Sequence, residues 1–268
     1  PEHRARASVI LLLHSLLLHR QNPLRDTVPP LRSTIEMSLV DGDGQFAADC
    51  ALVYLTHLQI SGAALPAVIA AGDDWIARLA ICGDSNGLRL CRFLVANWHR
   101  LAETVDVDTG LNGDEEALVA RLEAARNRTG LFIVYSALLF RQMLAQDYAA
   151  AVQTAARARQ YVDALTPGLV SEAIFQQIDS LAQLHQLSPQ PRLRRLQLQR
   201  VAANQRSLQR WAELSPQNHR HRWLQVEAQR HSLLGRDEAA ARDFNLAWEL
   251  ASREGLWPDA AGIAELAA

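Results

Sequence analysis

The sequence contains no lysine, so all 27 of its basic residues are arginine. The 29 acidic residues leave a net charge of -2, which argues against a general nucleic-acid binder, because affinity for phosphates needs a basic excess. Aromatic residues are also scarce, at 6%, whereas alanine and leucine are abundant. Alanine and leucine are strong helix formers, so the composition disfavours an all-β sandwich.

The sequence has only three cysteines, and their spacing matches no paired motif. Cys50, Cys82 and Cys91 form no C-x-x-C motif, and an odd number of cysteines in a long chain does not suggest a disulfide framework. We therefore expect reduced, buried thiols in a cytosolic protein.

Long apolar runs are missing as well. The longest, residues 7–18, is interrupted by His14 and is shorter than the roughly 20 residues that span a bilayer. No small-residue cleavage site of the kind that ends a signal peptide follows it. The run predicts a buried helix, no membrane partner and a cytoplasmic location.

Helical periodicity runs through nearly the whole chain. Apolar residues recur at helical spacing between breaks that contain Gly, Pro, Asp, Asn or Ser, and no stretch alternates for long enough to predict a sheet. The pattern predicts helices that include residues 46–60, 66–80, 88–103, 117–126, 171–186 and 192–213.

Two segments of the chain superimpose as internal repeats, residues 135–158 and 224–247. Each has a short turn followed by small or apolar residues at spacings of four and three, which let two antiparallel helices approach closely. A single helical hairpin cannot bury its apolar face, so neighbouring hairpins must stack. We therefore predict an all-α superhelix of helical hairpins that forms a single domain over residues 1–268.

The C-terminal third carries the most specific sequence pattern. Residues 203–213 read ANQRSLQRWAE, and they are followed by SPQN at 215–218, VEA at 226–228 and LGRDEA at 234–239. This stretch resembles the tetratricopeptide-like (TPR-like) region of large multidomain signalling proteins. In those proteins a serine/threonine-kinase-like module, a STAND-type ATPase, helical repeats, a GAF domain and often a histidine kinase share one chain. The resemblance implies an α-solenoid that is part of a longer protein.

The resemblance also implies a function. We expect a non-enzymatic interaction or sensor scaffold that binds a peptide, a protein partner or a neighbouring domain on a concave surface and relays to an ATPase or kinase. It implies no cofactor and no metal. The side chains that would line the surface come from the first helix of each repeat: Arg222, Gln225, Gln229 and Ser232 in the last copy, and Ile133, Ser136, Phe140 and Met143 in the earlier one.

Two alternatives remain open. One is a regulatory domain that binds a small-molecule effector inside the superhelix. The other is an esterase, because residues 83–87 read GDSNG and match G-x-S-x-G with Ser85 as nucleophile. That chemistry needs a strand, a strained elbow and His and Asp partners, whereas a glycine-rich link between two helices explains the same residues.

The other motifs are better explained as turns and solvated faces. The acidic stretches that begin at residues 41, 106 and 108 lack the terminal glutamate of a calcium loop. His219 and His221 are two residues apart, which does not place them on one helix face for zinc. The ten arginines between residues 191 and 236 fit a solvated face as well as an anion-binding one.

Overall fold

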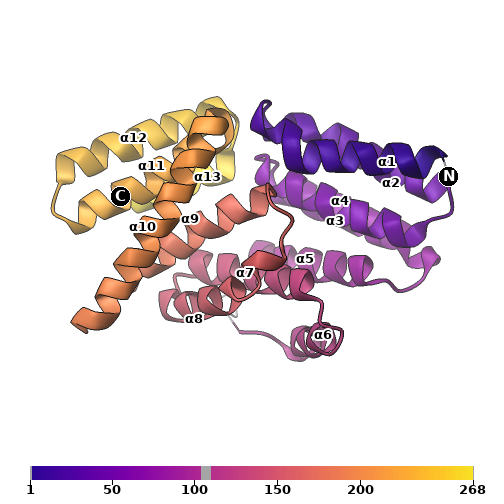
Figure 1. Ribbon diagram of the computed structural model, residues 1–268, viewed down its shortest axis with the longest axis horizontal. Coiled ribbons are helices and arrows are strands. Elements are labelled where there is room, and N and C mark those ends of the chain that lie inside the picture. Colours follow the sequence, from indigo (N-terminus) through magenta and orange to yellow (C-terminus); the bar gives the residue numbers. More distant parts are fainter. Residues whose placement is uncertain (1, 104–109, 268) are drawn as a thin grey trace.

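A computed structural model describes residues 2–103 and 110–267, and every regular element in these ranges is helical (Figure 1). The all-α prediction is therefore confirmed. The α-helices are α1 (Glu2–Leu12), α2 (Val28–Val40), α3 (Gly44–Ile60), α4 (Leu65–Leu79), α5 (Asn86–Glu103), α6 (Gly113–Ala124), α7 (Arg128–Leu144), α8 (Tyr148–Arg159), α9 (Val170–His185), α10 (Pro191–Leu214), α11 (Pro216–Leu233), α12 (Asp237–Arg253) and α13 (Trp257–Ala267).

The two predicted hairpins form as the sequence indicates. The turn between α7 and α8 ends at Asp147, whose side chain caps α8 by accepting from the backbone N–H of Ala150 at 3.1 Å. The turn between α11 and α12 passes through Gly235 with φ of 66°, a conformation that glycine adopts without strain. Ala151, Ala155 and their counterparts in α12 are buried where each pair of helices crosses.

The hairpins are packed side by side along the chain. Helix α3 contacts α5, α5 contacts α7, α7 contacts α9, and α9 contacts α11, while the even-numbered helices fill the spaces beside them. One large apolar core extends from α2 through α9, and two smaller cores lie among the helices from α9 to α13. Each hairpin therefore buries apolar surface both between its own two helices and against the neighbouring hairpins.

The N-terminal apolar run differs from the expected buried helix. Helix α1 ends at Leu12, and a π-helical turn (Leu13–Leu17) and a short 3-10 turn follow. Val9, Leu12 and Leu17 are each more than half exposed. The physical reason is that α1 lies at the edge of the stack. Helix α2 is the only described α-helix that it contacts extensively, so one side of α1 stays uncovered.

The cysteines also depart in part from the prediction. All three are free thiols, and Cys50 and Cys91 are buried as expected, but Cys82 is exposed. It lies in a 3-10 turn after α4, outside the apolar seams between helices. Among the described helices, none combines the length and the apolar character needed to cross a bilayer.

Candidate functional site

The first and last hairpins of the chain meet, and this closure contact joins residues 19–25 to Gly168, Ser215, Asn218 and Glu254 (Figure 1). Asn218, in the first turn of α11, provides three of its hydrogen bonds. The Asn218 Nδ2 donates to the backbone carbonyls of His19 at 2.6 Å and Asn22 at 2.9 Å, and Oδ1 accepts from the N–H of Leu24 at 3.0 Å. One buried amide therefore satisfies three backbone groups of the segment between α1 and α2.

Close backbone approaches extend the closure contact. Arg25 donates to the carbonyl of Glu254 at 2.6 Å, in the turn between α12 and α13. Gly62, with φ of 93°, lies so near the same turn that a Cβ at this position would be 2.2 Å from the carbonyl oxygen of Gly255. Only glycine fits there, both for its φ and for the space.

Histidines gather at the closure contact. The ring of His19 lies 6.3 Å from that of His57 and 6.0 Å from Trp211, and His219 lies 5.1 Å from Trp211 on the other side. His19, His57 and His219 are buried almost completely. Burial lowers the pKa of His57 to about 3, and it lowers the pKa values of His19 and His219 as well. The cluster is therefore neutral in the folded protein at pH 7.

Two of the sequence-predicted binding residues, Arg222 and Gln225, lie inside the molecule. Arg222 Nη1 and Nη2 donate to the two carboxylate oxygens of Asp259 on α13 at 2.9 and 2.8 Å. Arg222 Nη1 also donates to Gln177 Oε1 at 2.8 Å, and Gln177 Nε2 donates to Gln225 Oε1 at 2.6 Å. Burial raises the pKa of Asp259, but the charges and hydrogen bonds of Arg222 and His221 together outweigh it, so the net shift is downward. These contacts join α9, α11 and α13 instead of facing a ligand.

The other two residues of the last copy are more accessible. Gln229 is half-buried, and Ser232, near the end of α11, is exposed. Their side chains remain available to a partner, whereas those of Arg222 and Gln225 have intramolecular partners.

The four predicted residues of α7 are all half-buried. Ile133 and Met143 pack against the main core. The hydroxyl of Ser136 is buried without a hydrogen-bond partner among the described residues, and Phe140 is partly open to solvent. Among these four residues, Phe140 offers a partner the most direct contact surface, because its side chain is not already part of the core.

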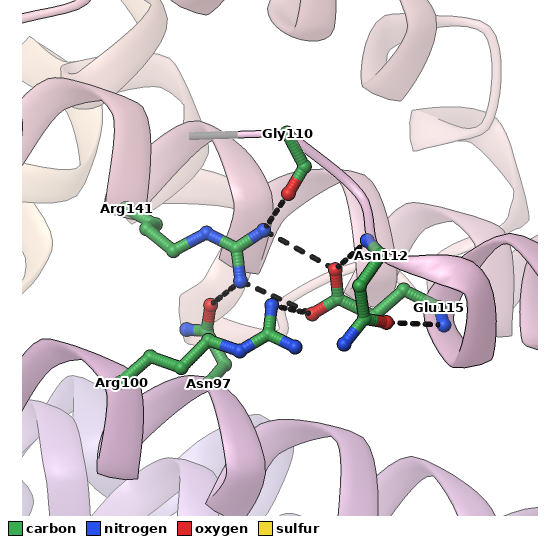
Figure 2. Close-up of polar contacts among 6 residues, drawn as sticks. All are labelled: Asn97, Arg100, Gly110, Asn112, Glu115 and Arg141. Atoms are coloured by element: carbon green, nitrogen blue, oxygen red, sulfur yellow. Dashed lines mark hydrogen bonds and ion pairs between the residues drawn. The ribbon is translucent and has the colours of Figure 1, made fainter. Parts of the chain in front are cut away.

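A second buried charged cluster holds α6 against α5 and α7 (Figure 2). Arg141 on α7 is fully buried, and its Nη1 donates to Glu115 Oε1 at 3.1 Å and to Asn97 Oδ1 at 3.0 Å. Arg100 donates to the same Glu115 oxygen at 3.0 Å. Glu115 also forms a reciprocal capping box with Asn112. Burial raises the pKa of Glu115, but hydrogen bonds and charge from Arg141 outweigh it, and the net shift is downward.

The candidate esterase motif is a helix start. A 3-10 turn, not a strand, precedes it, and the Oγ of Ser85 accepts from the backbone N–H of Leu88 at 3.2 Å at the beginning of α5. Ser85 thus has the contact of a helix cap. Among the described residues no group of three or more His, Cys, Asp or Glu side chains is placed to hold a metal ion. The acidic stretch around residues 106 and 108 lies outside the described residues.

Sequence reasoning did not identify the closure contact. Asn218 lies in the SPQN stretch that carries the family resemblance, and His219 belongs to a histidine pair that suggests zinc, so neither pattern indicates a contact with residues 19–25. A serine and an asparagine near a proline-initiated helix are typical of any cap, so the pattern contains no signal for a partner about 200 residues away.

Comparisons with family models, with curated proteins and with solved structures find no match for this chain.

Proposed function

We propose that the chain is a non-catalytic interaction module, a TPR-like solenoid that binds a protein, a peptide or a neighbouring domain and relays that binding to an ATPase or kinase module. The observation that carries the proposal is the continuous row of contacts between α3, α5, α7, α9 and α11. In solenoids such a row presents one extended surface, on which a partner contacts several repeats at once.

The closure contact gives the proposed relay a physical element. It ties the segment before α2 to the α10–α11 and α12–α13 turns, so the two ends of the helical stack are coupled. A partner that binds better to the open or to the closed arrangement would shift the population between them by its difference in affinity. We propose that a flanking ATPase or kinase responds to that shift.

The proposed relay can be tested first on the complete reading frame that encodes this chain, by looking for flanking modules. ATPase or kinase motifs on either side would support the relay, and their absence would contradict it. Where such modules exist, each is produced separately and its binding to the chain is measured by biolayer interferometry. We expect Phe140→Ala and Ser232→Ala to weaken binding, while Glu249→Gln, on the surface of α12, leaves it unchanged.

The small-molecule alternative stays a prediction. One surface depression, about 440 Å³, is formed entirely by residues of α10, and another, about 350 Å³, lies between α12 and α13. A hollow on one helix cannot enclose a small ligand, which pockets in proteins usually do.

A further inference from the structure

One end of helix α10 projects from the body of the molecule (Figure 1). The helix has 24 residues, against 16 for α9 and 18 for α11, so its first turns extend past the helices on which it packs. Residues 191–196 are all exposed. A partner site at this end of α10 and the adjacent end of α8 rests on the proposed function and deepens it by naming the chemistry of a partner.

Two arginines share one carboxylate at the base of this projection. Asp179 on α9 is completely buried, and Arg159 at the end of α8 forms an ion pair with it. Arg200 on α10 lies 4.0 Å from the same carboxylate, too far for a hydrogen bond. The Asp179 oxygens also accept from Asn204 at 2.8 Å and from Gln183 at 3.2 Å. The carboxylate is therefore well supplied with donors, and one positive charge of the pair remains unbalanced.

The two guanidinium groups keep donors available for a second anion. About a third of each side chain remains exposed, so a second anion can approach the pair from solvent, although the Nε of Arg159 itself is buried. Burial and the charge of Arg200 lower the pKa of Arg159 to about 10. An oxyanion placed between the groups would accept from both, and arginine is well suited to such bidentate recognition.

An apolar strip leads away from this pair along α10. Leu193 and Leu196 are 46% and 54% exposed, and with Arg200 they lie at spacings of three and four, on one helix face. Exposed leucines in a row are typical of interaction surfaces rather than of solvated helices. The same region has no acidic residue from position 180 to position 212, while it contains six arginines. A complementary partner is therefore acidic and carries apolar side chains.

We propose that Arg159, Arg200, Leu196 and Leu193 form a docking site for an acidic peptide segment, with one carboxylate bound between the arginines and apolar side chains seated on the leucines. The buried carboxylate of Asp179 positions the two arginines. The alternation of leucine and arginine around α10 favours a peptide over a membrane, because the apolar and basic residues are not segregated to opposite faces. A net charge of -2 favours a peptide over nucleic acid.

The site is tested with a random peptide display library selected on the intact chain. We expect enriched peptides to contain Asp or Glu with two nearby apolar residues. Their affinity, measured by fluorescence anisotropy, should fall about tenfold in Arg200→Gln and in Leu196→Gln, and it should weaken as salt is raised. Arg206→Gln is the matched control, because it removes the same charge from another exposed face of α10 and should leave the affinity unchanged.

Each other outcome is decisive. No enrichment, enrichment without acidic residues, or equal loss in Arg206→Gln would overturn the docking site. Tighter binding of a single-stranded oligonucleotide or of anionic vesicles, with the same dependence on Arg200, would reassign the surface and overturn the peptide proposal. Peptides that respond to Phe140→Ala but not to Arg200→Gln would overturn this site and leave the proposed interaction function standing.

Discussion

The side chain of Asn218 donates to the backbone carbonyl of His19 at 2.6 Å, across 199 positions of the sequence. The same amide bonds Asn22 and Leu24, so one residue at the start of α11 orders the segment between α1 and α2. This contact makes the two ends of the helical stack depend on each other.

Asn218→Ala should lower the free energy of unfolding by about 3 kcal/mol, because several buried backbone groups lose their partner at a cost of about 1–3 kcal/mol each. Urea denaturation monitored by circular dichroism measures the change. Asn245→Ala, at an exposed position of α12, should change stability by no more than about 0.5 kcal/mol. Equal effects of the two substitutions would contradict the role of the closure contact.

Gly62→Ala should destabilise the fold more than Gly42→Ala. Both glycines have positive φ, 93° and 73°, so both substitutions introduce backbone strain of about 1 kcal/mol. Only at Gly62 would the new Cβ also meet the carbonyl oxygen of Gly255, whereas nothing lies within 4 Å at Gly42. We expect a midpoint of thermal unfolding clearly lower for Gly62→Ala, and similar midpoints would show that the two turns do not approach each other.

Stability should fall as the pH drops below about 6.5. The pKa values of His19, His57 and His219 are lowered by burial, so the unfolded chain binds more protons than the folded chain in this range. Each such histidine costs up to about 1.4 kcal/mol per pH unit until its folded pKa is reached. The pKa values of Glu115 and Asp259 are also lowered, so their stabilising contribution is fully present above the ordinary pKa of a carboxyl and is lost only as the pH falls below it.

The histidine contribution can be separated by substitution. Urea titrations between pH 7.5 and pH 5 should give a shallower slope of stability against pH for His219→Leu than for the original chain, whatever the absolute stability of the variant. Asn245→Ala, which removes no titratable group and lies at an exposed position, should keep the original slope. An unchanged slope in His219→Leu would remove this residue from the explanation.

Glu115→Gln should cost about 3 kcal/mol, since it leaves the fully buried Arg141 without its anionic partner. The neighbouring Glu116→Gln, which removes the same charge at an exposed position, should have little effect. Combining Glu115→Gln with Arg141→Met should restore part of the loss, because the unpaired buried charge disappears. If the stability loss of the double variant exceeded the sum of the two single losses, the two side chains would not be coupled as Figure 2 indicates.

Ser85→Ala should cost about 1 kcal/mol, the usual contribution of a helix cap. Hydrolysis of p-nitrophenyl acetate should stay at the background rate both before and after the substitution. Activity in the original chain that Ser85→Ala abolishes would establish the esterase alternative and contradict the non-catalytic proposal.

Local features of the fold could be predicted because they depend on residues close in sequence. The α7–α8 and α11–α12 hairpins follow from helical periodicity, from turn residues such as Gly235 and from alanines at the crossings. The acidic start of α6 follows from the helix dipole and the capping box. The binding residues were harder to predict, since the periodicity that places Arg222 on a face of α11 does not show that Asp259 of α13 covers it.

The amino-acid sequence by itself determined that the chain is helical, where most of its helices begin and end, and which helices pair as neighbours, because capping, turns and periodicity act over a few residues. Only the tertiary structure decided that the stack closes on itself at Asn218, that α1 leaves leucines exposed, and that Arg159 and Arg200 share one buried carboxylate. These contacts depend on how far each helix is rotated relative to the next one along the chain. The rotations add up over many helix pairs, and no local sequence pattern encodes their sum.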